Sequence, residues 1–354
     1  MKKAGKFGVF KLLCLCVVVA VVSAIPTLAV AKGKKAGIEE NLKGNVSSFQ
    51  GILTVWNVDT FESGSQSKTV FLENAGTQFS KDNQGLYLLI KNLSVEEMTQ
   101  NFMSGIYPDI ISFGFGIGKM VQPLLENLAT LDTGAVRGEI LSSGTDGEGL
   151  KAVGFLMGGY ILSSTEEKLV ASGLDKTVNL SGVLNSAGFD TETKKGVRHT
   201  SSLVVGENPY INFLESIEIA FGQGAEDVYK SVSAYDGYLD FVGYNKGTIL
   251  LGTHRDLYKL SGRVKMGKIS GVKLEFVPSW TNLVQYVGVI KGVVDEKKEL
   301  AKRFVEFLVA NESQSYSTRI GMINTLGETF YEEGEFKNME EVLNKKLAIP
   351  NLFN

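Results

Sequence analysis

Few residues of this chain are arranged for catalysis or metal binding. The chain has two histidines, His199 and His254, and neither has a second ligand at the spacing that helical zinc sites use. Residues 114–119 look like a phosphate-binding loop, but the spaced leading glycine is missing and Met120 stands where that loop needs Ser or Thr. The sequence contains no Gly-x-Ser-x-Gly motif for a nucleophilic serine. We therefore expect no metal, no cofactor and no catalytic centre.

One pair of carboxylates keeps an enzymatic alternative open. Asp132 and Glu139 could serve as the acid and base of a glycosidase, because such enzymes place two carboxyl groups beside the scissile bond. The chain has 39 Asp and Glu residues, so chance explains such a pair better. The formal net charge of −3 gives no electrostatic reason to expect nucleic acid as a partner.

The N-terminal residues determine the expected compartment. A basic leader with four lysines precedes an apolar run at residues 12–31, which contains Pro26 and ends in a small-x-small site at Ala29 and Ala31. These are the three regions of a secretory signal peptide, so residues 1–31 predict export to the periplasm or the cell surface. An uncleaved membrane anchor is the alternative, because the run is nearly long enough to span a bilayer.

Cleavage after Ala31 would change the composition of the mature chain. Both cysteines, Cys14 and Cys16, would be removed, so disulfides and cysteine-bound metals are not expected. The four lysines of the leader would also be lost, which takes the formal charge from −3 to −7. Residues 32–50 are polar and contain several glycines, which is typical of a linker.

The residues after this linker alternate between strand and helix patterns. Apolar runs rich in β-formers predict strands at 52–56, 86–90 and 109–113. Between them lie an amphipathic helix and a second helix that begins with a capping box at Ser94 and Glu97. This spacing implies right-handed crossovers and a parallel sheet, whose ligands bind beyond the carboxyl ends of the strands.

The rest of the chain continues the α/β pattern and is too long for one ordinary core, so we expect two lobes. Helices are predicted at 211–221, 225–242, from Asp295 onward and at 339–346, and strands at 153–162 (broken by two glycines), 248–252 and 284–290.

Several segments, taken in order, resemble the extracellular solute-binding proteins of ABC importers, in the carbohydrate-binding family that includes maltose-binding protein. The segments that carry this resemblance are residues 53–56, 105–114, 152–156, 287–290, 295–304 and 314–322. The resemblance implies an α/β, two-lobe periplasmic-binding-protein-like fold of type II, with discontinuous lobes joined by hinge strands that close on a ligand. Lobe one would contain 51–151 and 284–310, and lobe two 152–283 and 311–354.

The resemblance also implies where a ligand would bind. Sugar sites pair aromatic faces with planar polar groups. At the loops that would meet in the cleft the candidates are Asp59, Thr60, Glu62, Phe113, Phe115, Met157, Tyr160, Thr253, Arg255 and Trp280.

Some of these candidates have a structural alternative. Trp280 follows Pro278 in an expected loop and is the best aromatic candidate. Phe113 and Phe115 are equally consistent with packing between helices. Arg255 is equally consistent with an ordinary ion pair with its neighbour Asp256.

The function implied by the resemblance is a monomeric receptor that captures a small solute, expected to be a saccharide, for the membrane permease of an ABC importer. Two alternatives remain open. One is a secreted carbohydrate-active enzyme, and the other is a binding protein that serves a surface sensor.

Overall fold

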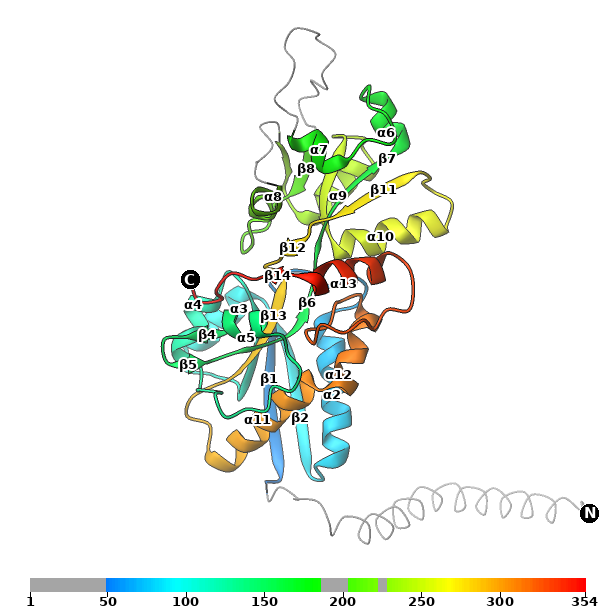
Figure 1. Ribbon diagram of the computed structural model, residues 1–354. Coiled ribbons are helices and arrows are strands. Elements are labelled where there is room, and N and C mark those ends of the chain that lie inside the picture. The colour runs from blue at the N-terminus through cyan, green and yellow to red at the C-terminus, as the bar shows by residue number, and fades with distance from the viewer. Residues whose placement is uncertain (1–48, 186–202, 222–227) are drawn as a thin grey trace, which may run out of the picture. The chain divides into compact units, whose positions relative to one another are not determined.

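The computed structural model describes residues 49–185, 203–221 and 228–354. The expected signal peptide, most of the linker and His199 lie outside these residues. Residues Phe49–Asn354 form one compact unit built on two five-stranded sheets (Figure 1). None of the described helices is long and apolar enough to cross a membrane.

The first sheet has the strand order β2-β1-β3-β13-β6. Its strands are β1 Gly51–Val58, β2 Leu86–Leu93, β3 Ile110–Gly114, β13 Val284–Val289 and β6 Val153–Met157. Strand β1 pairs in parallel with β2 and β3, which confirms the parallel pairing predicted from the spacing. Strand β13 runs antiparallel to both β3 and β6, so a late segment of the chain closes this sheet.

Helices from both ends of the described chain pack against the first sheet. They are α2 Lys68–Asp82, α3 Val95–Met103, α4 Gly118–Val121, α5 Gly138–Ser143, α11 Asp295–Val309, α12 Asn311–Ser315 and the 3-10 turns η1 Gln122–Leu124 and η2 Tyr316–Ile320. The Ser94–Glu97 capping box that starts α3 is present. Phe79 of α2 packs edge-on against Phe304 of α11, with 5.2 Å between ring centroids. Helix α11 begins at Asp295 as expected, but Val294 holds the N-cap position.

The second sheet has the strand order β11-β7-β10-β8-β9. Its strands are β11 Val272–Phe276, β7 Tyr160–Thr165, β10 Ile249–Thr253, β8 Leu203–Gly206 and β9 Val228–Ser231. Strand β8 is parallel to both β9 and β10, whereas β7 is antiparallel to β10 and β11. Its helices are α6 Glu166–Ala171, α7 Leu180–Asn185, α8 Phe213–Phe221, α9 Ala234–Val242 and α10 His254–Lys265.

The helix predicted over 225–242 is wrong in its first part. Residues 225–227 lie outside the described residues, and Val228–Ser231 is strand β9, which pairs with β8. Helix α9 starts only at Ala234, because the Ser233 hydroxyl accepts a hydrogen bond from the backbone N–H of Asp236. The β-branched and aromatic residues that begin β9 and this serine cap are the local signals that separate the two elements.

Short segments connect the two sheets. Gly158 and Gly159 separate β6 from β7, and the chain returns to the first sheet after Leu283. These crossings are bonded to each other, since the Gly158 N–H donates to the Leu283 carbonyl at 2.7 Å and the Thr281 hydroxyl donates to the Gly158 carbonyl at 2.8 Å. The chain therefore leaves the first sheet after Met157, later than the lobe boundary placed before residue 152.

The segment after α11 returns to both parts of the unit. The backbones of Met157 and Ile323 exchange hydrogen bonds of 2.9 and 2.8 Å, which fixes residues near 323 to the end of β6. Further on, α13 Glu335–Lys345 leads into β14 Leu347–Ala348, which pairs with β12 Ser279–Trp280. The C-terminal stretch is therefore not confined to the second sheet, although residues 311–354 were expected to belong to lobe two.

Candidate functional site

A pocket of about 620 Å³ lies where loops from the two sheets meet. One wall, here called the first wall, is residues 59–67, which follow the carboxyl end of β1. The opposite side, the second wall, follows the carboxyl ends of β8, β9 and β10 and consists of Glu207, Asn208, Pro209, Tyr210, Phe213, Ser233, Ala234, Tyr235, Thr253, Arg255 and Lys259. This is the edge at which α/β sheets bind ligands.

A buried lysine holds the first wall in place. Lys68, the first residue of α2, is fully buried, and its ammonium donates to the Asp59 carboxylate at 3.0 Å and to the Phe61 carbonyl. The ammonium also lies 3.8 Å from the centroid of the Phe61 ring. Burial lowers the pKa of Lys68, and the negative charge of Asp59 opposes that shift. Asp59 is thus partly neutralised before any ligand arrives.

Thr60 joins the first wall to the core behind it. Its hydroxyl points toward Gly114, where a Cβ would lie only 2.3 Å from the oxygen, so no larger residue fits there without movement. Behind this contact the fully buried Gln285 amide donates to the Ser112 hydroxyl at 2.8 Å and to the Val58 carbonyl at 3.2 Å. These bonds connect the end of β1, from which the pocket loop leaves, to strands β3 and β13.

Arg255 dominates the second wall. Helix α10 starts with a capping box in which Thr253 and Asp256 bond each other's backbone N–H groups. This places the Arg255 guanidinium against the Glu62 carboxylate of the first wall and 3.4 Å from the Asp256 carboxylate. Burial raises the pKa of Asp256 to about 6, an effect that its hydrogen bond from Thr253 and the positive charge of Arg255 oppose.

An aromatic side chain covers the cations of the second wall. Tyr235 is 49% exposed, and its ring lies 5.5 Å from the Arg255 guanidinium carbon and 4.7 Å from the Lys259 ammonium. These are cation–π distances. Burial lowers the pKa of Lys259, and the neighbouring Arg255 charge acts in the same direction. Tyr235 therefore offers the pocket a half-exposed aromatic ring backed by positive charge.

His254 lies behind the pocket and not in its lining. Its ring is fully buried, edge-on to Phe61 at 6.1 Å, and neither ring nitrogen has a hydrogen-bond partner among the described residues. Burial lowers the pKa of His254 to about 3, and the charge of Lys68 adds to that shift. The imidazole is therefore neutral near pH 7. In the described part of the chain no cluster of three or more potential ligands could hold a metal ion.

The structure brings five of the ten predicted binding residues together at this pocket, namely Asp59, Thr60, Glu62, Thr253 and Arg255. Asp256 also pairs with Arg255, so the ordinary ion pair that was the alternative exists beside the contact to Glu62.

The other five predicted residues do not line the pocket; they are Phe113, Phe115, Met157, Tyr160 and Trp280. Phe113 and Met157 are fully buried, and Phe115 packs edge-on against Tyr286 at 5.7 Å. The Trp280 ring is stacked at 6.1 Å on Tyr160, whose hydroxyl donates to the Asn282 side chain at 2.5 Å. Large aromatic side chains near a strand end stabilise the protein more when they are buried in the core than when they line a solvent-exposed pocket.

Several lining residues were missed from the sequence, chief among them Asn208, Tyr210, Tyr235 and Lys259. Asn208 and Tyr210 follow β8, a strand that the sequence reading did not identify. Lys259 lies one helical turn after Arg255 and shares its face of α10, so an i, i+4 search from Arg255 would have found it.

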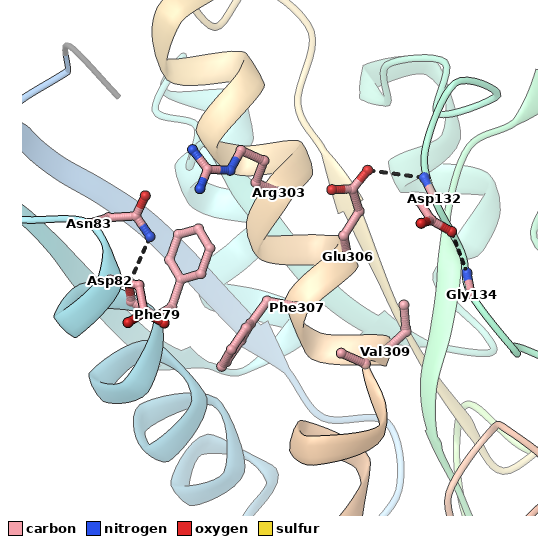
Figure 2. Close-up of a pocket in the computed structure, with 10 residues that line it drawn as sticks. Phe79, Asp82, Asn83, Asp132, Gly134, Arg303, Glu306, Phe307 and Val309 are labelled. Carbon is pink, nitrogen blue, oxygen red and sulfur yellow. Dashed lines mark hydrogen bonds between the residues drawn. The ribbon is translucent and has the colours of Figure 1, made fainter. Parts of the chain in front are cut away.

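A second, smaller pocket of about 380 Å³ lies between α2, α11 and the loop before α5 (Figure 2). Phe79 and Phe307 form an apolar side with 5.5 Å between their rings, and Glu306 accepts a hydrogen bond from the backbone N–H of Asp132 at 3.0 Å. Glu139 does not line this pocket and pairs with Arg137 at 3.6 Å. The pocket thus does not unite the two carboxylates of the glycosidase alternative.

Comparison with known proteins gives a fold and no sequence family. No family model matches the chain, and no curated protein matches it by sequence. Among solved structures, a putative oligosaccharide periplasmic-binding protein from Synechococcus in complex with zinc superposes with a TM-score of 0.64 at 10% identity, covering 85% of this chain and 88% of its own. The GacH receptor of Streptomyces glaucescens, solved unliganded and with acarbose, gives 0.59 at 12% identity, with 85% and 88% covered.

The same fold also occurs in an enzyme. Thiaminase I from Bacillus thiaminolyticus superposes with a TM-score of 0.57 at 10% identity, covering 85% of this chain and 95% of the enzyme. At such identities the likeness concerns the fold alone. The chain has the two-lobe α/β fold of periplasmic binding proteins, as the sequence predicted.

Proposed function

We propose that this protein is an extracytoplasmic receptor that binds a small saccharide and delivers it to the membrane permease of an ABC importer. The observation that carries the proposal is the pocket whose two walls come from different sheets. A ligand in it contacts both walls at once, so binding favours the closed arrangement of the hinge and gives a permease a state to recognise. The permease and the monomeric state rest on the resemblance of the sequence.

The chemistry of the walls supports a neutral, hydroxyl-rich ligand. Asp59 and Arg255 are planar polar groups that already have partners of opposite charge, so the pocket carries little unbalanced charge beyond Glu207 and Lys259. Serine and threonine hydroxyls of the lining add donors and acceptors. Tyr235 supplies a half-exposed aromatic ring against which sugar C–H groups can pack. The acarbose complex of one fold neighbour and the oligosaccharide description of another support the same ligand class.

A thermal-shift screen tests the receptor and its ligand class. The full chain, purified in mild detergent because of its apolar N-terminal run, would be screened against monosaccharides, oligosaccharides, polyols and amino acids. A ligand that binds only the native state adds about 2.7 kcal/mol of stability at a hundredfold excess over its Kd. We expect a saccharide hit that Asp59→Asn weakens. Stabilisation by amino acids alone would contradict the saccharide as the ligand class and leave the receptor proposal in place.

The fate of the hit separates the receptor from the secreted enzyme. Recovery of the saccharide unchanged after long incubation, measured by mass spectrometry, is the outcome that the receptor requires. Its conversion to a product would replace the receptor with an enzyme of the same fold. Co-purification of the chain with its permease from membranes, dependent on ligand, would separate import from a sensor role.

Export is the remaining part of the proposal and rests on the N-terminal residues. Mass spectrometry of the protein from the extracytoplasmic fraction should find a first residue of Lys32, after cleavage behind Ala31. Recovery of the intact chain from membranes would establish the anchored alternative, which leaves the receptor proposal in place.

A further inference from the structure

We propose that Glu62 and Arg255 form a latch that holds the two walls of the pocket together before a ligand binds. The inference rests on the proposed function only in taking the pocket as the ligand site. It concerns the regulation of that site, namely how much of the receptor is already closed when its ligand arrives.

The two residues of the pair differ in burial and in their other partners, which suits a contact that can open. Arg255 is anchored on the second wall, with its side chain 7% exposed, a carboxylate of Asp256 on one side and the Tyr235 ring on another. Glu62 is 57% exposed and extends from the loop of the first wall to the Arg255 Nε group. Among the described residues Glu62 has no other ion pair. Opening the pocket would therefore free a solvated carboxylate and leave the guanidinium with its partners on the second wall.

Behind this pair the Phe61 ring packs edge-on against His254 of α10, and two weaker polar contacts join the walls beside it. The Asn208 side-chain amide donates to the Thr60 carbonyl at 3.0 Å, and its oxygen is already engaged by the backbone N–H groups of Tyr210 and Ile211. Tyr210 also lies against Gly116 of the first-sheet side, where a Cβ would come within 2.5 Å of the Tyr210 carbonyl. These are polar or backbone contacts, which can exchange with water at low cost.

The connections between the sheets are suited to a motion that would break these contacts. Gly158 and Gly159 form one crossing, and the His254 ring fills the space beside Gly158, where a Cβ would lie 2.2 Å from it. His254 precedes Arg255 in the chain, so the helix that carries the latch also packs on the crossing. A rotation at the glycines would change the distance between Glu62 and Arg255 directly.

The consequence is a competition inside the pocket. A ligand hydroxyl that bonds Glu62 or Arg255 competes with the ion pair between them, which lowers affinity. The same ion pair keeps part of the protein in the closed arrangement that the ligand needs, which raises affinity. Because apparent affinity scales with the fraction of competent receptor, weakening the latch should weaken binding even where no ligand contact is lost. The latch also neutralises Arg255, which disfavours anionic ligands.

Distance measurements on the full chain test the latch without any ligand. Both cysteines would be replaced by serine, and spin labels placed at Tyr87 on β2 and Val170 on α6, which are 72% and 64% exposed. Pulsed electron–electron double resonance would then give the distribution of distances between the two labels, one on each sheet's side of the pocket. We expect Glu62→Gln to raise the ratio of open to closed protein about two- to five-fold, the range for a half-exposed ion pair. High salt should move the wild type in the same direction.

Two further measurements make the outcome decisive. Glu73→Gln removes an exposed carboxylate of α2 that has no ion pair in the described part of the chain, and should leave the distribution unchanged. High salt should change the distribution of Glu62→Gln less than that of the wild type, because the charge pair that salt screens is already lost in the variant. Identical distributions in the wild type and in Glu62→Gln would overturn the latch. This result is independent of whether the ligand screen finds a saccharide.

Discussion

Two residues at the start of α10, His254 and Asp256, respond to acid in opposite directions. The pKa of His254 is lowered from 6.5 to about 3, so the unfolded chain takes up the proton first and stability falls as the pH drops below 6.5. The pKa of Asp256 is raised from 3.8 to about 6, so the native protein takes up that proton first and stability rises as the pH drops below 6. Between about pH 6 and pH 4 the two effects offset each other.

Asp256→Asn should therefore make the protein more sensitive to acid. Asparagine keeps an acceptor for the Thr253 N–H group, so the cap of α10 is retained, while the offsetting proton uptake is lost. We expect the free energy of unfolding of the variant to fall more steeply than that of the wild type from pH 6 to pH 4, by up to about 1.4 kcal/mol per pH unit. Urea unfolding at several pH values measures this, and parallel curves would contradict it.

The residues of the pocket were only partly predictable from the sequence. Asp59, Thr60 and Glu62 follow a clear strand, and the rule that ligands bind beyond strand ends places them correctly. Trp280 does not line the pocket because its ring stacks on Tyr160. These two residues are far apart in the chain, so no local sequence pattern reveals the contact. The buried Lys68 was not predicted for a similar reason. A lysine at the start of a helix is expected to be solvent-exposed unless a partner such as Asp59 is known.

At the scale of elements, one carboxylate fixes a long loop to a helix. Glu340 of α13 is fully buried and accepts hydrogen bonds from the backbone N–H groups of Phe330 and Tyr331 at 3.0 and 3.1 Å. Its other oxygen accepts from the Asn324 amide at 2.7 Å. Burial raises the pKa of Glu340, and the bond from the Tyr331 N–H is the largest effect that opposes the shift. All three donors need an acceptor at this position.

Glu340→Gln should destabilise the protein although its shape is nearly unchanged. The amide brings an N–H group into a site filled with donors, so at least one buried donor loses its acceptor, at a cost of about 1–3 kcal/mol. Glu341→Gln is the matched control, because the neighbouring side chain is exposed, and it should change stability by less than about 0.5 kcal/mol. Equal urea midpoints for the two variants would show that Glu340 is not the anchor of this loop.

The elements themselves were predicted best where the local signals were strong and the pairing was simple. The capping box at Ser94 and the alternation of strand and helix gave β1, β2, β3 and their helices. The antiparallel entry of β13 into the first sheet was not predictable from its apolar run, because such a run reads the same in either direction. Strand β9 was not predicted, and its residues were assigned to a helix, because four residues are too few to show the alternation that identifies a strand.

At the scale of the whole molecule, the last residues connect the two sheets. Helix α13 packs against α10 of the second sheet, and β14, which follows α13, pairs in parallel with β12 next to the crossing back to the first sheet. The chain then reaches α5, where the Leu352 N–H donates to the Ser143 carbonyl at 3.0 Å and the Ser143 hydroxyl donates to the Pro350 carbonyl at 2.5 Å. Leu352 is only 2% exposed. The stretch therefore acts as a second tie between the sheets, far from the hinge glycines in the sequence.

Leu352→Ala tests whether this tie matters for the cooperativity of the molecule. Removal of a buried leucine side chain should cost about 2–5 kcal/mol, and the loss falls on a segment that joins two folding units. The chain has two tryptophans, Trp56 in β1 and Trp280 in β12, so Trp56→Phe and Trp280→Phe backgrounds report each side separately in urea. In the wild type we expect coincident transitions. In Leu352→Ala the two midpoints should separate, whereas the exposed Asn354→Ala should leave both in place. Coincident midpoints in Leu352→Ala would mean that the C-terminal stretch is not needed to couple the two sheets.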